Sequence, residues 1–258
     1  MNDSVKFSVI VITKNEANNI TDCLQSVKML ADEIIVFDSG STDGTQEICV
    51  SLGATVYETD WPGFGSQKNR ALGQATGEWV LSIDADERLT PELAAEIKTV
   101  IRQHSSLHVY TLPRISSYCG QFMRYGGWYP DRVARLFRRG SAQFSNDIVH
   151  ESLITDASLG ALHNPLLHIS YRSLDEVLEK INFYSSAGAE KLAKSGRKTS
   201  LTAAIARGFW AFIRTYFLKL GFLDGKLGLL LAISNAEGTY YKYIKLWLIS
   251  QQEIRDGQ

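Results

Sequence analysis

The feature that most constrains this chain of 258 residues is a short apolar run that ends in carboxylates. Residues 79–83 are typical of a buried strand, and Asp84, Asp86 and Glu87 follow at once. Carboxylates this close repel one another, so a bound divalent cation is a natural reason for the sequence to tolerate them. The pattern therefore predicts a metal site at the carboxyl end of a buried strand.

The first hundred residues alternate between β-branched apolar runs and amphipathic helical patterns. This alternation implies parallel strands with right-handed crossovers, and so an open α/β sheet whose strand ends meet at one edge. We expect ligands to bind at that edge, where four polar clusters converge. The predicted strands are 7–13, 33–37, 55–58 and 79–83, the helices are 18–30, 46–52 and 66–74, and the clusters are 13–16, 38–43, 63–70 and 84–87.

The pattern changes after a helix that Thr90 and Pro91 are predicted to begin. Residues 109–170 contain short strands and turns rich in glycine, tyrosine and arginine, and helical patterns then return. The later predicted helices are 174–194, capped by Ser173, 201–220 and 226–250. We expect a sheet domain at 1–172, with a nucleotide-sugar half at 1–105 and an acceptor half at 106–172, followed by a helical region at 173–258.

The composition, 45% apolar and 21% charged, is that of an ordinary folded protein. A net charge of −1 argues against a nucleic-acid partner, because such binders usually carry a basic excess. The three cysteines lack metal-ligand spacing and are expected to be reduced, packed thiols. No apolar signal core opens the chain and no segment reaches about 18 uncharged apolar residues, so we expect a cytoplasmic protein without a membrane-spanning helix.

Three of the strand-end segments carry longer motifs. They are Ile10-Val-Ile-Thr-Lys-Asn-Glu16, Ile35-Val-Phe-Asp-Ser-Gly-Ser-Thr-Asp-Gly-Thr45 and Ala75-Thr-Gly-Glu-Trp-Val-Leu-Ser-Ile-Asp-Ala-Asp-Glu87. In this order they resemble the motifs of family-two inverting glycosyltransferases, which have the GT-A fold. The compact length, the element Val149-His-Glu151 and the basic, aromatic C-terminus are similar to bacterial lipopolysaccharide inner-core β-1,4-glucosyltransferases.

The resemblance implies a Rossmann-like, mostly parallel open sheet with flanking helices and a helical C-terminal extension. It implies a metal-dependent enzyme that moves a hexose, expected to be glucose from UDP-glucose, to a lipopolysaccharide core heptose or a similar lipid-linked glycan. Mg²⁺ or Mn²⁺ would neutralise the leaving diphosphate. Two alternatives stay open: a sugar nucleotidyltransferase, which would usually carry a glycine-rich loop after the first strand, and a catalytically silent glycan-binding protein on the same fold.

The donor and metal residues follow from the matching motif positions. Asp86 is similar to the family's principal metal ligand, and Asp84 to a residue that binds ribose or shares the metal shell. Asp38 matches a residue that contacts uracil or ribose, although the motif's second aspartate is Ser39 here. Lys68 stands where the family often has an arginine near the base or the phosphate, and a solvated charge is the alternative. Thr13, Asn15 and Glu16 resemble the loop that surrounds the nucleotide.

Inversion needs a base that takes the proton of the acceptor hydroxyl from outside the nucleotide cluster. Glu151 is preferred, because subfamily relatives carry a similar His-Glu pair, and Asp131 is the alternative. Trp128 and Tyr129 suit stacking on the acceptor sugar, although aromatic residues in such a turn often only hold the turn. Arg132 would contact a phosphorylated acceptor, and a solvated strand edge explains it equally.

The C-terminal third is basic and aromatic. Residues 200–245 contain six lysines and arginines against Asp224 and Glu237. Apolar side chains edged by Arg, Lys, Trp and Tyr are typical of a helix that lies on an anionic membrane surface, and packing against the sheet domain is the alternative. Since the implied acceptor is a lipid, we expect a peripheral protein on the inner face of the bacterial inner membrane.

Overall fold

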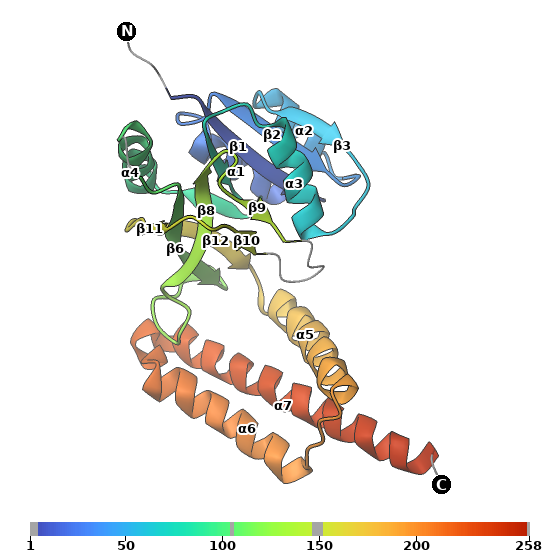
Figure 1. The fold of residues 1–258 in the computed structure, drawn as a ribbon. Coiled ribbons are helices and arrows are strands. Elements are labelled where there is room, and N and C mark those ends of the chain that lie inside the picture. The colour runs from blue at the N-terminus through green and yellow to red at the C-terminus, as the bar shows by residue number, and fades with distance from the viewer. Residues whose placement is uncertain (1–4, 104–105, 146–151, 257–258) are drawn as a thin grey trace. The chain divides into compact units, whose positions relative to one another are not determined.

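The structure is a computed structural model that describes residues 5–103, 106–145 and 152–256 (Figure 1). The chain packs as two compact units. Met1–Arg114 with Asp131–His168 form the sheet unit, and Ile115–Pro130 with Ile169–Gln258 form the helical unit. The sequence predicts a domain boundary after residue 172. That the parts before and after it are independent domains remains a proposal.

The first half of the sheet unit has the predicted alternation of strands and helices. The parallel strands lie in the order β3-β2-β1-β4, so β1 has β2 on one side and β4 on the other. The carboxyl ends of these strands therefore meet at one edge, as expected. The elements are β1 (Phe7–Thr13), α1 (Ala17–Val27), β2 (Glu33–Asp38), α2 (Thr45–Ser51), β3 (Thr55–Glu58), α3 (Phe64–Gln74) and β4 (Trp79–Ser82).

The second half of the sheet is mixed and brings distant segments to the same edge. Beyond β4 the order continues β8-β6-β12-β5, with β8 antiparallel to both β4 and β6, and β12 antiparallel to β5. The elements are β5 (Glu87–Leu89), α4 (Pro91–Arg102), β6 (Val109–Tyr118), β7 (Gln121–Phe122), β8 (Asp131–Arg138), β9 (Gln143–Phe144), β10 (Leu153–Ile154), β11 (Leu159–Ala161) and β12 (Leu166–Tyr171).

Local signals work as the sequence indicates. Thr90 caps α4 by accepting the backbone N–H of Leu93 at 3.1 Å, with Pro91 as the first helical residue. Cys23 and Cys49 are free, buried thiols in the core, as expected, whereas Cys119 is a free thiol that is only partly buried. The expected α/β sheet with flanking helices and C-terminal helices is thus confirmed.

The helical unit is built around one long helix, α7 (Gly225–Asp256), against which α5 (Leu174–Lys194) and α6 (Leu201–Ile213) pack. The predicted helix 201–220 is interrupted: after α6 comes a π-helical turn, η1 (Arg214–Leu218), then the 3₁₀ turn η2 (Gly221–Asp224). There the N–H of Lys219 reaches the carbonyl of Arg214, one residue further than in an α-helix. Within the described ranges no helix combines the length and apolarity needed to cross a bilayer.

Candidate functional site

Asp38, at the end of β2, organises the nucleotide side of the edge. Its buried carboxylate accepts hydrogen bonds from Thr13 Oγ1 at 2.8 Å, the N–H of Ser41 at 2.7 Å and Gln46 Nε2 at 2.7 Å. Burial alone would raise the pKa of Asp38, but the hydrogen bonds from Ser41, Thr13 and Gln46 outweigh it and hold the pKa below its ordinary value. The ionised carboxylate therefore fixes the loop after β2 against the end of β1.

The loop after β1 is tied to the loop after β2. Asn15 has a left-handed backbone (φ 57°), which asparagine tolerates, and its N–H donates to Ser41 Oγ at 2.7 Å. The Asn15 side-chain oxygen accepts the N–H of Thr42 at 2.9 Å, and the N–H of Glu16 donates to Thr45 Oγ1 at 2.8 Å. The predicted donor residues on these two loops are thus brought together in one wall.

Asp84 is held between two cations. Lys68 Nζ lies 2.9 Å from Asp84 Oδ1, and Arg135 on β8 pairs with the other oxygen. Burial alone would raise the pKa of Asp84, but Arg135 and then Lys68 hold it well below its usual range. Lys68 is only 2% exposed, so the alternative of a solvated lysine is wrong.

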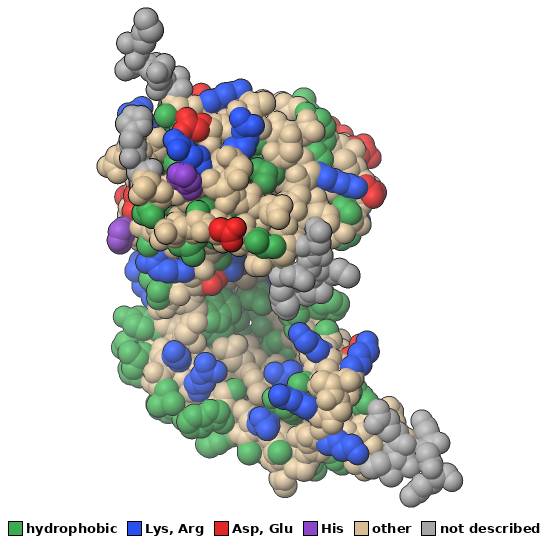
Figure 2. All heavy atoms as spheres, in the orientation of Figure 1, with side chains coloured by type: hydrophobic (Ala, Val, Ile, Leu, Met, Phe, Trp, Pro, Cys, Tyr) green, Lys and Arg blue, Asp and Glu red, His purple; other side chains and the backbone are tan. Residues whose placement is uncertain are grey.

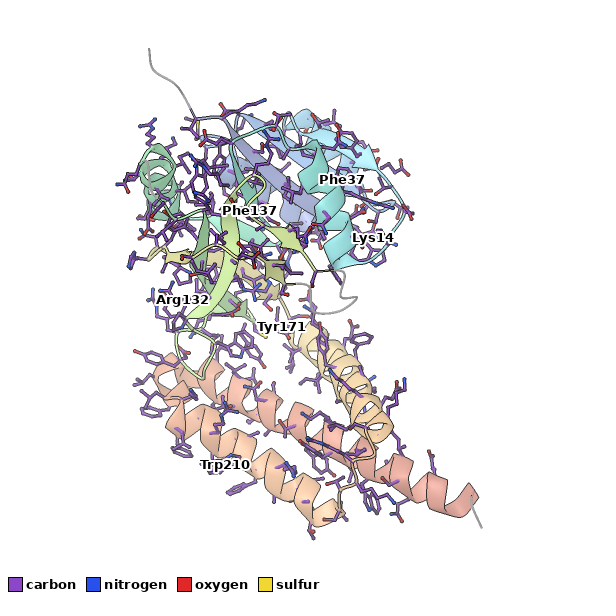
Figure 3. The ribbon with its side chains drawn as sticks, in the orientation of Figure 1. Lys14, Phe37, Arg132, Phe137, Tyr171 and Trp210 are labelled. Carbon is purple, nitrogen blue, oxygen red and sulfur yellow. The ribbon has the colours of Figure 1, made fainter. Side chains whose placement is uncertain are left out.

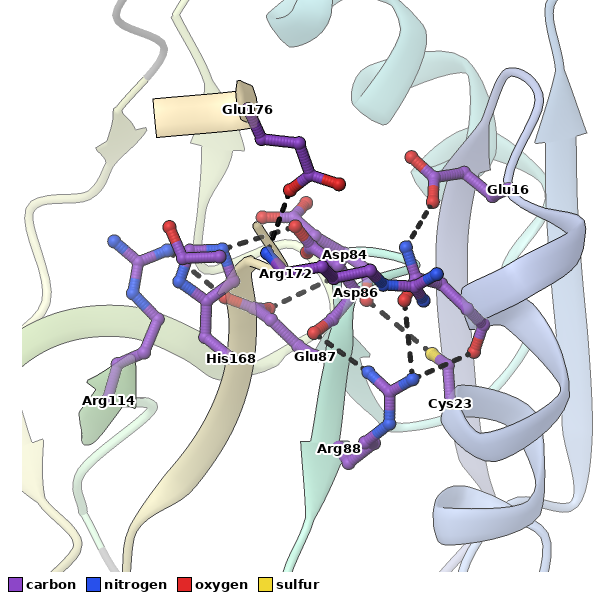
Figure 4. A network of polar contacts seen from close by, with 12 residues as sticks. Glu16, Cys23, Asp84, Asp86, Glu87, Arg88, Arg114, His168, Arg172 and Glu176 are labelled. Atoms are coloured by element: carbon purple, nitrogen blue, oxygen red, sulfur yellow. Dashed lines mark hydrogen bonds and ion pairs between the residues drawn. The ribbon is translucent and has the colours of Figure 1, made fainter. Parts of the chain in front are cut away.

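Glu87 is fully buried beneath the same cluster. Its Oε1 lies 2.8 Å from Arg135 Nη2 and 3.2 Å from Arg114 Nη1, while Oε2 accepts the N–H of Asp84 at 3.0 Å. Figure 4 shows Glu87 with its neighbours Asp84, Arg114 and Asp86. Basic side chains, which the sequence argument for a metal did not consider, therefore neutralise two of the three carboxylates.

Asp86, the third carboxylate, has a different partner. Its Oδ2 lies 3.2 Å from Nε2 of His168 on β12 (Figure 4). No motif marks His168, because it stands far along the chain and has no ligand spacing. The pairing of His168 with Glu87 in the β12–β5 ladder brings it here. In the described residues no group of three or more His, Cys, Asp and Glu side chains is arranged to hold a metal. Asp86 and His168 are a hydrogen-bonded pair, and the predicted metal site stays a proposal.

Of the two candidates for the base, Asp131 lies within the described residues. Glu151 lies outside the described residues. Asp131, the alternative, is paired with Arg114: its Oδ2 accepts from Nε at 3.0 Å and from Nη2 at 2.6 Å. Both hydrogen bonds use the same oxygen, so Arg114 already occupies the Oδ2 atom of Asp131.

The predicted acceptor residues fall in both units. Trp128 and Tyr129 belong to the helical unit, and Arg132 to the sheet unit. The Trp128 ring lies 5.8 Å from the ring of Tyr118 and 5.9 Å from that of Tyr171, so it is part of an aromatic cluster. Arg132 is exposed, and its Nη1 donates to the carbonyl of Leu162 at 3.1 Å (Figure 3). Their part in acceptor binding stays a proposal.

Comparison with known families and proteins gives a consistent result. The family described as Glycosyl transferase family 2 matches residues 8–157. A glycosyltransferase of Rickettsia prowazekii, named as uncharacterized, is 32% identical over 252 residues, which cover 93% of this chain and 86% of that protein. The lipopolysaccharide core biosynthesis glycosyltransferase LpsC of Rhizobium meliloti is 29% identical over 256 residues, covering 92% of each chain.

Solved structures show a weaker likeness. The glucosyl-3-phosphoglycerate synthase of Mycobacterium tuberculosis, in a complex with Mn²⁺ and uridine-diphosphate-glucose, is 25% identical with a TM-score of 0.38. The match covers 44% of each chain. A likeness this low carries no argument about the ligands of this protein.

Proposed function

This chain belongs to glycosyl transferase family 2, and we propose that it is an inverting, metal-dependent hexosyltransferase of GT-A fold acting on a lipid-linked glycan. The proposed donor is a nucleotide sugar, UDP-glucose first among them, and the proposed acceptor is a lipopolysaccharide core heptose or a similar sugar. Similarity to LpsC over 92% of both chains supports the acceptor class. The motifs after β1, β2 and β4 support the donor class.

The observation that carries the proposal is the contrast inside the carboxylate cluster. Asp84 and Glu87 are neutralised by lysine and arginine, whereas among the described residues Asp86 has no ion pair with either residue type. A carboxylate oxygen suits both Mn²⁺ and Mg²⁺, whereas an imidazole nitrogen is accepted more readily by Mn²⁺ than by Mg²⁺. Asp86 would therefore hold the cation, with His168 as a second ligand when the cation is Mn²⁺. When bound, it would neutralise the charge that develops on the leaving diphosphate.

The remaining roles follow from the positions of the side chains. Thr13, Asn15, Glu16 and Asp38 would surround the nucleoside. Asp84, whose side chain is 30% exposed, would accept a ribose hydroxyl while its two ion pairs keep it ionised and immobile. Lys68, buried against Asp84, would orient that carboxylate and lie near the phosphates.

Glu151 is the proposed base. It would remove the proton of the acceptor hydroxyl as the hydroxyl attacks the anomeric carbon, in one displacement and without a covalent intermediate. The ion pair of Asp131 with Arg114 supports this preference. Glu151→Gln should lower transfer by about 10²–10⁴-fold and leave donor binding intact; near wild-type turnover would remove Glu151 from the role.

The helical unit supports contact with an anionic membrane surface. α6 turns small residues, Ala204 and Gly208, toward α7, so its large apolar side chains face outward. Phe209 and Trp210 are 67% and 57% exposed, and Trp210 points away from α7 in Figure 3. Basic and apolar side chains are interspersed over this unit in Figure 2. The apolar side chains suit the acyl region of a membrane, and the basic side chains suit its anionic headgroups.

Membrane binding is tested by cosedimentation with vesicles. Phosphatidylglycerol vesicles should bind the protein, phosphatidylcholine vesicles should not, and salt should weaken binding. Arg214→Gln with Lys226→Gln should reduce the partition coefficient about fivefold per charge removed. Equal partition of the double variant and the unchanged protein would contradict a surface held by charge.

The proposed reaction is tested by release of UDP or GDP from a panel of nucleotide sugars with a lipid-linked core glycan. We expect turnover that depends on Mn²⁺ or Mg²⁺, is lost with a chelator, and falls in Asp86→Ala and His168→Ala. Glu92→Gln, on exposed α4, is the matched control. Release of pyrophosphate would indicate a nucleotidyltransferase instead, and binding without turnover a silent glycan-binding protein.

A further inference from the structure

The helical unit contains a pocket that the proposed reaction does not use. It lies between α5 and α7 and its cavity volume is about 270 Å³. Tyr171 of β12, labelled in Figure 3, is part of its lining. All of its lining residues belong to the helical unit. Small-molecule sites begin at about 300 Å³, so a cavity of this size suits one sugar ring with a substituent and not an extended glycan.

The charge of the pocket is positive. Lys180 and Lys242 are its charged lining residues, and the lining contains no acidic side chain. Lys180 Nζ lies 4.6 Å from the centroid of the Tyr171 ring and 3.3 Å from the carbonyl oxygen of Ser170. Within the described part of the chain neither lysine is ion-paired with a carboxylate. Lys242 Nζ lies 5.0 Å from the centroid of the Tyr243 ring. Neither ammonium group is neutralised by these contacts, and each keeps N–H donors for an anionic ligand.

A third lysine nearby, Lys245, has an ammonium group whose protons are all used in hydrogen bonds within the protein. Lys245 Nζ donates to Asn182 Oδ1, Ser185 Oγ and Ser186 Oγ, each at 2.8 Å. Three such hydrogen bonds use the three protons of an ammonium group. Lys245 therefore joins α7 to α5, in contrast to Lys242, one turn earlier on the same helix.

The neutral groups of the pocket suit a sugar. Asn235 and Thr239 offer an amide and a hydroxyl, which bind sugar hydroxyl groups as donors and acceptors. The Tyr184 ring is 56% exposed, so its face is open to the C–H side of a sugar ring. Burial raises the pKa of Tyr171, so its hydroxyl stays protonated and can donate.

Gly238, in the middle of α7, is an independent sign that the space is kept open. Glycine destabilises a helix interior relative to alanine, so it usually has a packing reason. Such a reason exists at Gly208, where an added Cβ would lie 3.0 Å from Tyr240 Cβ. At Gly238 an added Cβ would meet only Ile181, at an ordinary 3.8 Å. Packing within the protein does not explain this glycine, and a ligand in the pocket does.

We propose that this pocket binds a phosphorylated sugar, with Lys180 and Lys242 on the phosphate and Tyr184, Asn235 and Thr239 on the ring. Ammonium groups act on phosphate as point charges and need no fixed fork geometry, which suits two lysines on different helices. The sugar phosphate belongs either to a lipid-linked glycan or to a free metabolite. The assignment of the ligand to the lipid-linked acceptor rests on the proposed function. The binding of a sugar phosphate in the pocket does not depend on that function.

Isothermal titration of the unchanged chain tests the proposal. Glucose 6-phosphate should bind about tenfold more tightly than inorganic phosphate, and more tightly than glucose or glucuronate. Lys180→Gln with Lys242→Gln should weaken this binding about tenfold or more. The matched control, Lys191→Gln with Lys194→Gln, removes two exposed lysines of α5 outside the pocket and should change nothing. Tighter binding of phosphate alone, or of glucuronate, would overturn the proposal.

A second variant separates this pocket from the donor site. Gly238→Phe should fill the cavity and abolish binding of glucose 6-phosphate, and Gly238→Ala should weaken it by a smaller factor, because its methyl group enters the space assigned to the ligand. UDP binding should persist in all of these variants. Sugar-phosphate binding unaffected by both Gly238→Phe and the Lys180/Lys242 double variant would overturn the proposal. Failure of UDP to bind the unchanged protein would instead count against the proposed transferase.

The source of the ligand is decided by competition. Vesicles that carry a phosphorylated lipid-linked glycan should displace glucose 6-phosphate from the unchanged protein, whereas vesicles without the glycan should not. Displacement by both kinds of vesicle would mean that the two lysines bind anionic lipid whether or not a sugar is present. That result would overturn the proposed sugar-phosphate site.

Discussion

The two units hold their basic side chains in opposite ways. In the sheet unit, Lys68 and Arg135 are buried against Asp84 and Glu87, so each charge is fixed by a neighbour. In the helical unit, Lys180 and Lys242 line a pocket whose lining contains no carboxylate. A buried, paired charge orients the groups around it, whereas an open one is free to meet a ligand. Burial and pairing, more than residue type, therefore separate the cations that orient Asp84 and Glu87 from the two that line the pocket.

The strongest way to break this comparison is to remove one cation from each unit. Arg135→Met leaves Asp84 and Glu87 without a shared buried partner, and should lower the free energy of unfolding by about 3–5 kcal/mol. Lys242→Met, in the open pocket, should change it by less than about 0.5 kcal/mol. Urea denaturation of both variants measures the difference. Equal losses of unfolding free energy in Arg135→Met and Lys242→Met would contradict the distinction between buried, paired cations and open ones.

Acid should weaken the sheet unit through its ionised carboxylates. Glu33 accepts from Ser8 Oγ at 2.5 Å and the N–H of Thr76 at 2.6 Å; burial alone would raise its pKa, but these bonds lower it from 4.5 to about 2. Because the folded pKa is the lower one, the stabilisation is complete above pH 4.5 and is lost as pH falls toward 2. It amounts to about 3 kcal/mol.

The measurement is the free energy of unfolding from pH 7 to pH 3. Glu33→Gln should be less stable than the unchanged protein at pH 7, and the two should converge as the pH falls. A gap that stays constant with pH would show that the Glu33 carboxylate does not titrate in this window.

Within the carboxylate cluster, function and stability should separate between adjacent residues. Asp86→Ala should weaken metal-dependent UDP binding by about 100-fold, because it removes a proposed ligand, and should leave stability nearly unchanged. Glu87→Gln should lower the free energy of unfolding and leave UDP binding nearly unchanged, since Glu87 is 0% exposed and pairs with Arg114 and Arg135. Calorimetry with UDP and Mn²⁺, and urea denaturation, measure the two quantities. Similar effects of both variants would contradict this division of roles.

The smallest expected effect compares one glycine of each unit. At Gly77 an added Cβ would lie 2.7 Å from the backbone nitrogen of Ser8, so Gly77→Ala should destabilise the sheet unit by about 1–3 kcal/mol. At Gly238 the added methyl has room, and Gly238→Ala should stabilise by about 0.5–1 kcal/mol. Thermal unfolding of the two variants should shift in opposite directions. A lower melting temperature for Gly238→Ala would show that this glycine has a packing role.

Much of the fold was predictable because its signals are local. The strand at Phe7–Thr13 and the helix at Leu174–Lys194 have the predicted bounds, and Ser173 caps that helix through the N–H of Glu176. Apolar periodicity and a capping side chain act over a few residues, so the sequence alone displays them. The π-helical turn η1 was missed, because its shifted hydrogen bonds leave no periodic pattern.

The site was predictable only where its residues follow a strand directly. Asp84, Asp86 and Glu87 follow β4 and lie at the expected edge, and Thr13 and Asp38 are joined there as expected. By contrast, nothing in the local sequence distinguishes Arg132 from Arg135, yet Arg132 is exposed and Arg135 is 7% exposed within the cluster. The pairing of β8 with β4 makes this distinction, and one sequence does not show such a pairing.

The sequence by itself determined the order of strands and helices, the edge where the carboxylates collect and the family motifs that surround them. The tertiary structure decided which charges meet: Arg135 and Lys68 with Asp84, His168 with Asp86, and no acidic partner for Lys180 and Lys242 in their pocket lining. The physical reason is that secondary structure depends on neighbours along the chain, whereas electrostatic energy depends on distance and burial in space.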